Sequence, residues 1–229
     1  VGIRELGQSV SGSSFIVMPY VPGGTILDYA RSAPAITQSQ IVRLFARICR
    51  AVGYAHLNGI THRDLSPANI RIDPAGEPHI LDFGLAALSE SPAAATALTS
   101  TGQFLGSIAY ASPEQASGSS VDPRTDVYAL GVILYQLLSG GRSPYPTSGA
   151  VMAAMHHIVH TPPTPLTAWQ LAASMPPPVS ASGASRSVAG PAWQISPVLE
   201  AIVLKALAKR PGDRYPDANA LAEDLERFL

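Results

Sequence analysis

The sequence THRDLSPANI, residues 61–70, decides how the rest of this chain is interpreted. Asp64 supplies a carboxylate and Asn69 a carboxamide five residues later, with Pro67 stiffening the loop between them. A helical pattern precedes the stretch, and a strand-like run after it leads to Asp82. A carboxylate that accepts a hydroxyl proton, beside an amide and a second carboxylate that share a magnesium ion, is suited to phosphoryl transfer from a nucleotide.

Length and composition indicate a globular protein. The chain has 229 residues, enough for one large domain or two small ones. Hydrophobic residues make up 46% and charged residues 14%, which allows a sizeable core and argues against global disorder. The formal net charge of -1 gives no electrostatic reason to expect nucleic acid or an anionic membrane as a partner.

The cysteine count and the length of the apolar runs indicate the cellular compartment of the protein. Cys49 is the only cysteine, which excludes an internal disulfide and a multi-cysteine zinc site and fits a reducing compartment. Its place in a helical pattern indicates a small packed residue. The longest apolar stretch, residues 127–138, is too short to span a bilayer. We expect a cytoplasmic location, which still allows a membrane tether outside this sequence. Val1 in place of an initiating Met favours a sequence that begins within a longer chain.

Apolar periodicity and turn residues predict the first elements. Residues 1–10 are a weak strand candidate, and residues 15–18 are a stronger one after a turn. Prolines and glycines in residues 19–24 indicate a connecting segment. Thr25 then caps a short helix that runs through Arg31.

The clearest helix starts at Thr37, where Gln40 completes a capping box, and stops at Gly59. Its predicted inner face consists of Ile41, Leu44, Phe45, Ile48, Val52 and Ala55. Residues 69–73 and 79–82 then form two short strands around a tight turn.

The middle of the chain contains a loop, a buried helix and an insertion. Residues 84–112 lack useful periodicity and are predicted to be a long, mobile loop, which in a compact domain is usually functional. Residues 127–138 are apolar on nearly every side, so they predict a helix buried all round, ended by Gly140-Gly141. Residues 150–160 look helical, and residues 174–192 are a low-complexity insertion that we expect to be disordered.

Two more helices are predicted near the C-terminus. Ser196 caps a helix that begins with Pro197 and runs to about Lys209. The last helix covers about residues 217–228, and its predicted inner face consists of Leu221, Leu225 and Phe228. Helices therefore dominate, with only two pairs of short strands.

The order of the polar motifs resembles that of the protein kinase family. The series consists of Asp64, Asn69, Asp82-Phe83-Gly84, Ser112-Pro113-Glu114, Asp126 at the start of a buried helix, and Arg214. The resemblance covers nearly the whole chain from Phe15 onward. It is closest to bacterial serine/threonine kinases, through residues 110–115 and 126–131.

The resemblance implies one protein-kinase domain of the α+β class, mainly helical. Residues 1–18 would be a remnant of the small-lobe sheet, residues 19–24 the hinge, and residues 25–229 the large lobe, interrupted by the insertion at residues 174–192. The implied activity is transfer of the γ-phosphate of ATP, with Mg²⁺, to a Ser or Thr hydroxyl of a protein substrate.

The resemblance also implies roles for the polar residues of the site. Asp64 would accept the substrate hydroxyl proton, and Asn69 and Asp82 would hold Mg²⁺ through oxygen atoms. Ser66 would complete the catalytic group by hydrogen bonding. Taken singly, Asn69 also fits turn chemistry and Asp82 a strand-end cap, so only the ordered series favours the joint interpretation.

Nucleotide binding is implied for the segment around the hinge. Met18, Pro19, Tyr20 and Val21 resemble the stretch whose backbone receives adenine, with the Pro19 carbonyl and the Val21 N–H as its polar groups. Arg71 lies where the family has an apolar residue below the adenine, so it would either stack on the base or swing away.

Other residues resemble supports of the site. His62 would stack with Phe83, and Asp126 would accept hydrogen bonds from the catalytic-loop backbone. Glu114 and Arg214 would form a buried ion pair.

Arg63, next to Asp64, marks the kinase class that an activation-loop phosphate switches on, because its fork suits a phosphate dianion. The candidate phosphate acceptors are Thr96, Thr99, Ser100 and Thr101.

Three departures from the family pattern weaken the predicted activity. Ser66 replaces a lysine that neutralises the transferring phosphoryl group, and Arg71 puts a charge below the adenine. The sequence also lacks a glycine-rich phosphate loop, a strand lysine and its helical glutamate, because the residues before Phe15 are too few to contain them. We expect the 229-residue chain by itself to bind ATP weakly and to transfer phosphate poorly.

Three functions therefore remain open. The first is a serine/threonine protein kinase, and the second is a pseudokinase that acts as a scaffold or regulatory binding module. The third is a small-molecule phosphotransferase of related fold, such as an antibiotic kinase, which residues 106–115 disfavour because such enzymes generally lack this peptide-docking segment.

Overall fold

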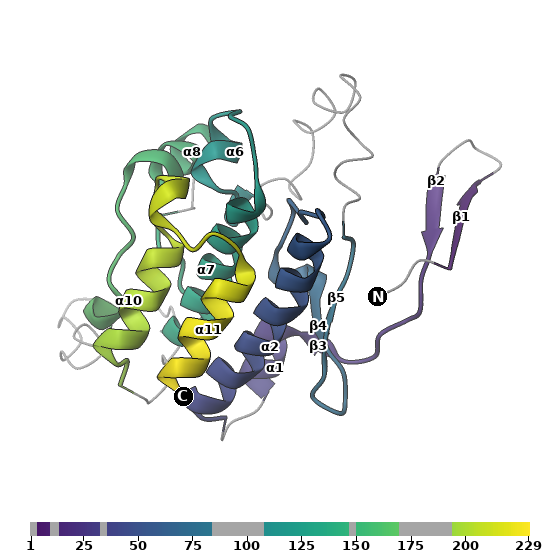
Figure 1. Cartoon of the computed structure of the whole chain (residues 1–229), viewed down its shortest axis with the longest axis horizontal. Coiled ribbons are helices and arrows are strands. Elements are labelled where there is room, and N and C mark those ends of the chain that lie inside the picture. The colour runs from purple at the N-terminus through teal and green to yellow at the C-terminus, as the bar shows by residue number, and fades with distance from the viewer. Residues whose placement is uncertain (1–3, 10–13, 33–35, 84–107, 147–149, 170–193) are drawn as a thin grey trace, which may run out of the picture.

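The computed structural model describes residues 4–9, 14–32, 36–83, 108–146, 150–169 and 194–229 (Figure 1). A helical body carries a small sheet on one side, and a separate hairpin stands beyond that sheet (Figure 1). The insertion predicted at residues 174–192 and the four candidate phosphate acceptors lie outside the described ranges, as does most of the loop predicted at residues 84–112.

The strands form two sheets. In the hairpin, β1 (Glu5–Gln8) pairs antiparallel with β2 (Ser14–Val17). In the other sheet, β3 (Gly24–Thr25) pairs with β4 (Ile70–Ile72), which pairs with β5 (Pro78–Ile80). The prediction of only two strand pairs was wrong, because β3 was missed. A two-residue strand has no periodicity of its own, so it is defined by its partner β4.

The predicted caps of the first helices are confirmed. α1 (Ile26–Ser32) begins after Thr25, whose Oγ1 accepts the N–H of Asp28 at 3.2 Å. α2 (Gln38–Leu57) has the full capping box of Thr37 and Gln40, and Gly59 follows its end with a φ of 73°. All six residues of its predicted inner face are buried.

The core lies around α7 (Pro123–Ser139), which is buried on every side as predicted. α10 (Pro197–Ala206) and α11 (Ala218–Phe228) pack against it, and α11 also packs closely on α2 (Figure 1). Gly53 of α2 allows this approach, since a Cβ there would lie 2.4 Å from the Asn219 side chain of α11. α8 (Val151–His160) is the predicted helix at residues 150–160.

Two helix predictions need correction. α6 (Pro113–Ala116) was not predicted, although Ser112 and Gln115 form a capping box at its start. α10 ends at Ala206, short of the predicted Lys209. Pro211 disfavours helical backbone at the residue before it. The Arg214 side chain also donates hydrogen bonds to the carbonyls of Ala208 and Lys209 at 2.7 and 3.0 Å, just beyond the end of α10. The described residues also contain two short 3-10 turns, η1 (Pro67–Asn69) and η2 (Pro211–Asp213).

Candidate active site

The backbone of the loop that leads into Asp64 is anchored to the core by Asp126. This residue lies in the first turn of α7, and its side chain is only 1% exposed. Its carboxylate accepts the N–H of His62 at 2.7 Å and that of Arg63 at 2.9 Å. The predicted role of Asp126 is therefore confirmed, and the loop that ends at Asp64 is fixed to the most buried helix.

His56 is a further support of the loop that the sequence analysis missed. Its Nε2 donates to Asp126 at 2.9 Å, because its Nδ1 already accepts the N–H of Ala218 at 3.3 Å. The imidazole thus joins the start of α11 to the residue that holds the catalytic loop. Only the fold shows what this histidine contacts.

We expect that His56→Leu lowers the free energy of unfolding by about 1–3 kcal/mol, because the Ala218 N–H loses its acceptor and the buried Asp126 carboxylate loses one of its three hydrogen bonds. Urea unfolding gives the stability change. Faster hydrogen exchange at the amide of His62 would show that the loop itself loosens. His79→Leu is the matched control, since the His79–Asp73 pair is partly exposed and its loss should cost about 0–1 kcal/mol.

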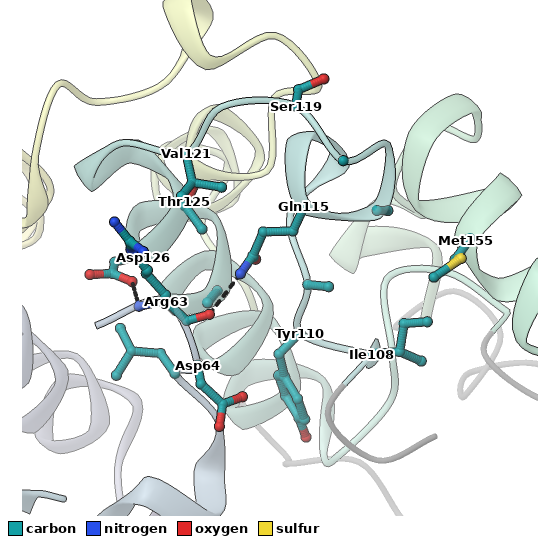
Figure 2. Close-up of a pocket in the computed structure, with 15 residues that line it drawn as sticks. Arg63, Asp64, Ile108, Tyr110, Gln115, Ser119, Val121, Thr125, Asp126 and Met155 are labelled. Carbon is teal, nitrogen blue, oxygen red and sulfur yellow. Dashed lines mark hydrogen bonds between the residues drawn. The ribbon is translucent and has the colours of Figure 1, made fainter. Parts of the chain in front are cut away.

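Arg63 adopts left-handed backbone geometry that its neighbours hold in place. Its φ is 68°, an unusual value for a side chain of this size. Its N–H is bound by Asp126, and its carbonyl accepts the side-chain amide of Gln115 at 2.7 Å (Figure 2). Strained backbone fixed from both sides is typical of a functional loop, and here it sets the direction of the chain into Asp64.

The side chain of His62 ties this loop to the segment that contains Asp82. Its Nε2 donates to the carbonyl of Leu81 at 2.8 Å, and its ring lies 4.9 Å from that of Phe83, so the predicted contact is confirmed. The Leu81 N–H in turn donates to the Asn69 carbonyl at 2.9 Å. The loop of residues 62–69 is thereby joined at both ends to residues 81–83.

Asn69 and Asp82 have side-chain atoms suited to a divalent cation. The Nδ2 of Asn69 donates to the Asp64 carbonyl at 2.8 Å, which leaves its Oδ1 as the acceptor on the other side of the amide. Asp82 is exposed and has a φ of 59°. One amide oxygen and one carboxylate are hard ligands of the kind that Mg²⁺ prefers, so the donor set fits the predicted ion.

Glu114 and Arg214 form the predicted buried ion pair. Both guanidinium-to-carboxylate hydrogen bonds measure 2.7 Å, and the side chains are 7% and 0% exposed. Burial by itself would raise the pKa of Glu114, but hydrogen bonds from Arg214 and Thr125 outweigh it and lower that pKa. The carboxylate is therefore held in its charged form, and α6 is fixed to the segment that follows η2.

The predicted nucleotide residues lie in the extended segment between β2 and β3. Met18, Pro19 and Val21 are partly buried, while the Tyr20 side chain is 84% exposed. The Arg71 side chain lies against the backbone of this segment, where its Nη2 donates to the Gly23 carbonyl at 2.6 Å. Arg71 thus adjoins the end of the hinge segment.

A pocket of about 450 Å³ adjoins Asp64. Its wall includes Gln115 of α6 and Met155 of α8, with Ile108 and Tyr110 from the segment before α6 (Figure 2). The hydroxyl of Tyr110 donates to Gln136 of α7 at 2.9 Å, which fixes this wall to the core. The sequence did not predict the pocket, because its residues come from four separate stretches.

Comparison with known proteins agrees with this arrangement. A family model described as "Protein kinase domain" matches residues 5–225. The chain is 35% identical to the serine/threonine-protein kinase pkn3 of Myxococcus xanthus over 99% of its length, and 36% identical to PknB of Mycobacterium leprae over the same share. It spans only 38% and 33% of the lengths of these two relatives.

A mainly helical body with a catalytic-type loop anchored in its core defines a kinase-like fold. The family model and the two relatives identify the family. The chain belongs to the protein kinase family, in the serine/threonine class of its bacterial relatives. In the part of the chain that the structure describes, no helix has the length and apolar character needed to cross a membrane.

Proposed function

We propose that this chain carries the catalytic residues of a serine/threonine protein kinase, which transfers the γ-phosphate of ATP to Ser or Thr hydroxyls of proteins. The observation that carries the proposal is the set of hydrogen bonds joining the Asp64 loop, Asn69 and the Leu81–Asp82 segment. Such a reaction depends mainly on positioning and charge stabilisation, which a rigid loop network provides.

Asp64 is proposed to act on the acceptor hydroxyl. It is an exposed side chain at the edge of the 450 Å³ pocket, so a protein segment lying in that pocket can bring a hydroxyl to it. The carboxylate would hold the hydroxyl oxygen in line for attack and take its proton. Ser66, two residues later, would add a hydrogen bond.

Asn69 and Asp82 are proposed to hold Mg²⁺ through their side-chain oxygens. The ion, when bound, supplies positive charge to the phosphate oxygens. The chain's own contribution is to place the two ligands, through the hydrogen bond from Asn69 to Asp64 and the one from His62 to Leu81.

The segment from Met18 to Val21 is proposed to bind adenine through its backbone. No hydrogen bond within the described residues uses the Pro19 carbonyl or the Val21 N–H, so both remain available to a ligand. Arg71, held at Gly23, is proposed to border the same site.

The decisive experiment uses the protein expressed from its complete coding sequence, with γ-labelled ATP, Mg²⁺ and a general protein substrate. Labelled phosphoserine or phosphothreonine is the expected product, and it should disappear when Mg²⁺ is chelated. A protein that binds ATP but forms neither product would contradict the proposal. The 229-residue chain assayed alone is expected to transfer phosphate slowly, because its sequence lacks the phosphate loop and the strand lysine.

A pseudokinase that acts as a scaffold is the second candidate, and two observations favour it. Ser66 cannot supply the charge of the lysine that the family places there. The Arg71 guanidinium lies beside the hinge segment, where it is bound to Gly23. The coding sequence upstream of Val1 offers a simple test, since a glycine-rich segment followed by a Val-Ala-x-Lys-like strand supports the enzyme and its lack supports the scaffold.

If the protein is an enzyme, Ser66→Lys is expected to raise kcat by about tenfold, because it restores a positive charge near the transferring phosphoryl group. Ser66→Met is the control for side-chain length without charge. Steady-state kinetics with ATP and a protein substrate measure the effect. Equal rates for the two variants would show that charge at this position does not limit transfer.

A further inference from the structure

α8 carries three histidines in its ten residues, at positions 156, 157 and 160. The inner face of the helix is formed by Ala154 and Ile158, which are buried. His156 and His160 are exposed and lie one turn apart, because residues four apart share a helix face. The two imidazoles are therefore neighbours on the side of α8 that faces solvent.

The geometry of this pair suits a shared metal ion. The ring centroids of His156 and His160 lie 4.8 Å apart, with the ring planes tilted by 49°. Two histidines at this helical spacing are a known way to supply two nitrogen ligands to zinc, at about 2.0–2.1 Å each. His157 is oriented differently, since its Nδ1 is hydrogen-bonded to Thr161 Oγ1 at 2.9 Å.

The ring nitrogens of the pair are available for coordination. Within the described residues, neither His156 nor His160 takes part in a hydrogen bond or an ion pair. The other three histidines of the chain, His56, His62 and His79, are all hydrogen-bonded. The single thiol is also excluded as a competing ligand, because Cys49 is fully buried and burial raises its pKa.

α8 is held rigidly enough to present two preorganised ligands. The Lys209 ammonium donates to the carbonyls of His157 and Ile158 in its last turns and also lies 3.8 Å from the centre of the Tyr145 ring. The helix further packs against α6. Preorganisation matters for a chelating pair, because once one imidazole binds the ion the second binds without a further loss of chain freedom.

We propose that His156 and His160 form a two-ligand site for a divalent transition-metal ion of the zinc and nickel class. No cluster of three or more His, Cys, Asp or Glu residues suited to a metal occurs among the described residues. The ion would therefore have two protein ligands and keep its remaining coordination positions open. Met155 of the same helix lines the pocket at Asp64, but neither histidine does, so the proposed metal site is separate from that pocket.

Calorimetric titration of the 229-residue chain with ZnCl2 and with NiCl2 tests the proposal. We expect one ion per chain, with an affinity reduced about 10²-fold in His156→Ala and also in His160→Ala, because either change removes the chelate. His157→Ala and His79→Ala should bind within about twofold of the parent, since neither removes a proposed ligand. Alanine favours helix at the three α8 positions, and His79 of β5 is partly exposed, so circular dichroism should show that all four variants remain folded.

A spectroscopic readout separates direct coordination from an indirect effect. Paramagnetic Ni²⁺ at a small molar fraction should broaden the imidazole signals of His156 and His160 before those of His79. Equal affinity in the parent and both single variants would overturn the proposal. So would a loss of binding in His157→Ala as large as that in His156→Ala.

Discussion

Asp64→Asn in the protein expressed from its complete coding sequence is expected to lower kcat for phosphoryl transfer by about 10²–10⁴-fold. The change removes the carboxylate that would orient the acceptor hydroxyl and take its proton, while the shape of the side chain stays nearly the same. Initial rates with γ-labelled ATP and a saturating protein substrate give the effect on kcat.

The fold should tolerate this change, because the Asp64 side chain is exposed and the loop is fixed through backbone groups of its neighbours. Asp213→Asn is the matched control, since it makes the same substitution at an exposed residue of η2 and should leave the rate unchanged. If Asp64→Asn transfers phosphate as fast as the Asp213→Asn control, the proposed role of Asp64 is wrong.

Arg214→Met is expected to lower the free energy of unfolding by about 3–5 kcal/mol, the usual cost of leaving one partner of a buried ion pair alone. Arg214 donates five hydrogen bonds, two to Glu114 and three to backbone carbonyls of residues 124, 208 and 209. Its guanidinium also lies 4.9 Å from the centre of the Tyr128 ring. Methionine fills part of the volume but satisfies none of these acceptors.

Urea unfolding of two further variants would show whether the stability cost comes from leaving a buried charge unpaired or from removing any arginine. Arg210→Met removes an exposed arginine whose partner Asp213 lies 3.9 Å away, and it should cost less than about 1 kcal/mol. The double variant Glu114→Gln with Arg214→Met should recover part of the loss, because no unpaired charge remains buried. A cost for Arg214→Met no larger than that for Arg210→Met would contradict the importance of the pair.

Features set by local chemistry could be predicted from the sequence. The capping box at Thr37, the stop at Gly59 and the apolar face of α2 all follow from residues within one or two turns of each other. The all-round burial of α7 follows from its composition alone. The ordered polar motifs were enough to indicate a protein kinase and to pair Glu114 with Arg214.

Features that depend on a distant partner and belong to no recognised motif could not be predicted. β3 is a strand only because β4 lies beside it, and α10 stops early partly because Arg214 takes the carbonyls beyond its end. His56 contacts Asp126 across 70 positions of sequence. No local pattern encodes such contacts, since their energy is realised only when the chain is folded.

The sequence by itself thus determined the family, the order of the longer helices and the identity of the residues proposed for chemistry, because propensities, caps and motifs act over short distances. Only the tertiary structure decided how the Asp64 loop is anchored, where Arg71 turns, and that a pocket opens beside Asp64. The physical reason is that these features are formed by groups that lie far from one another along the chain and meet only when it is folded.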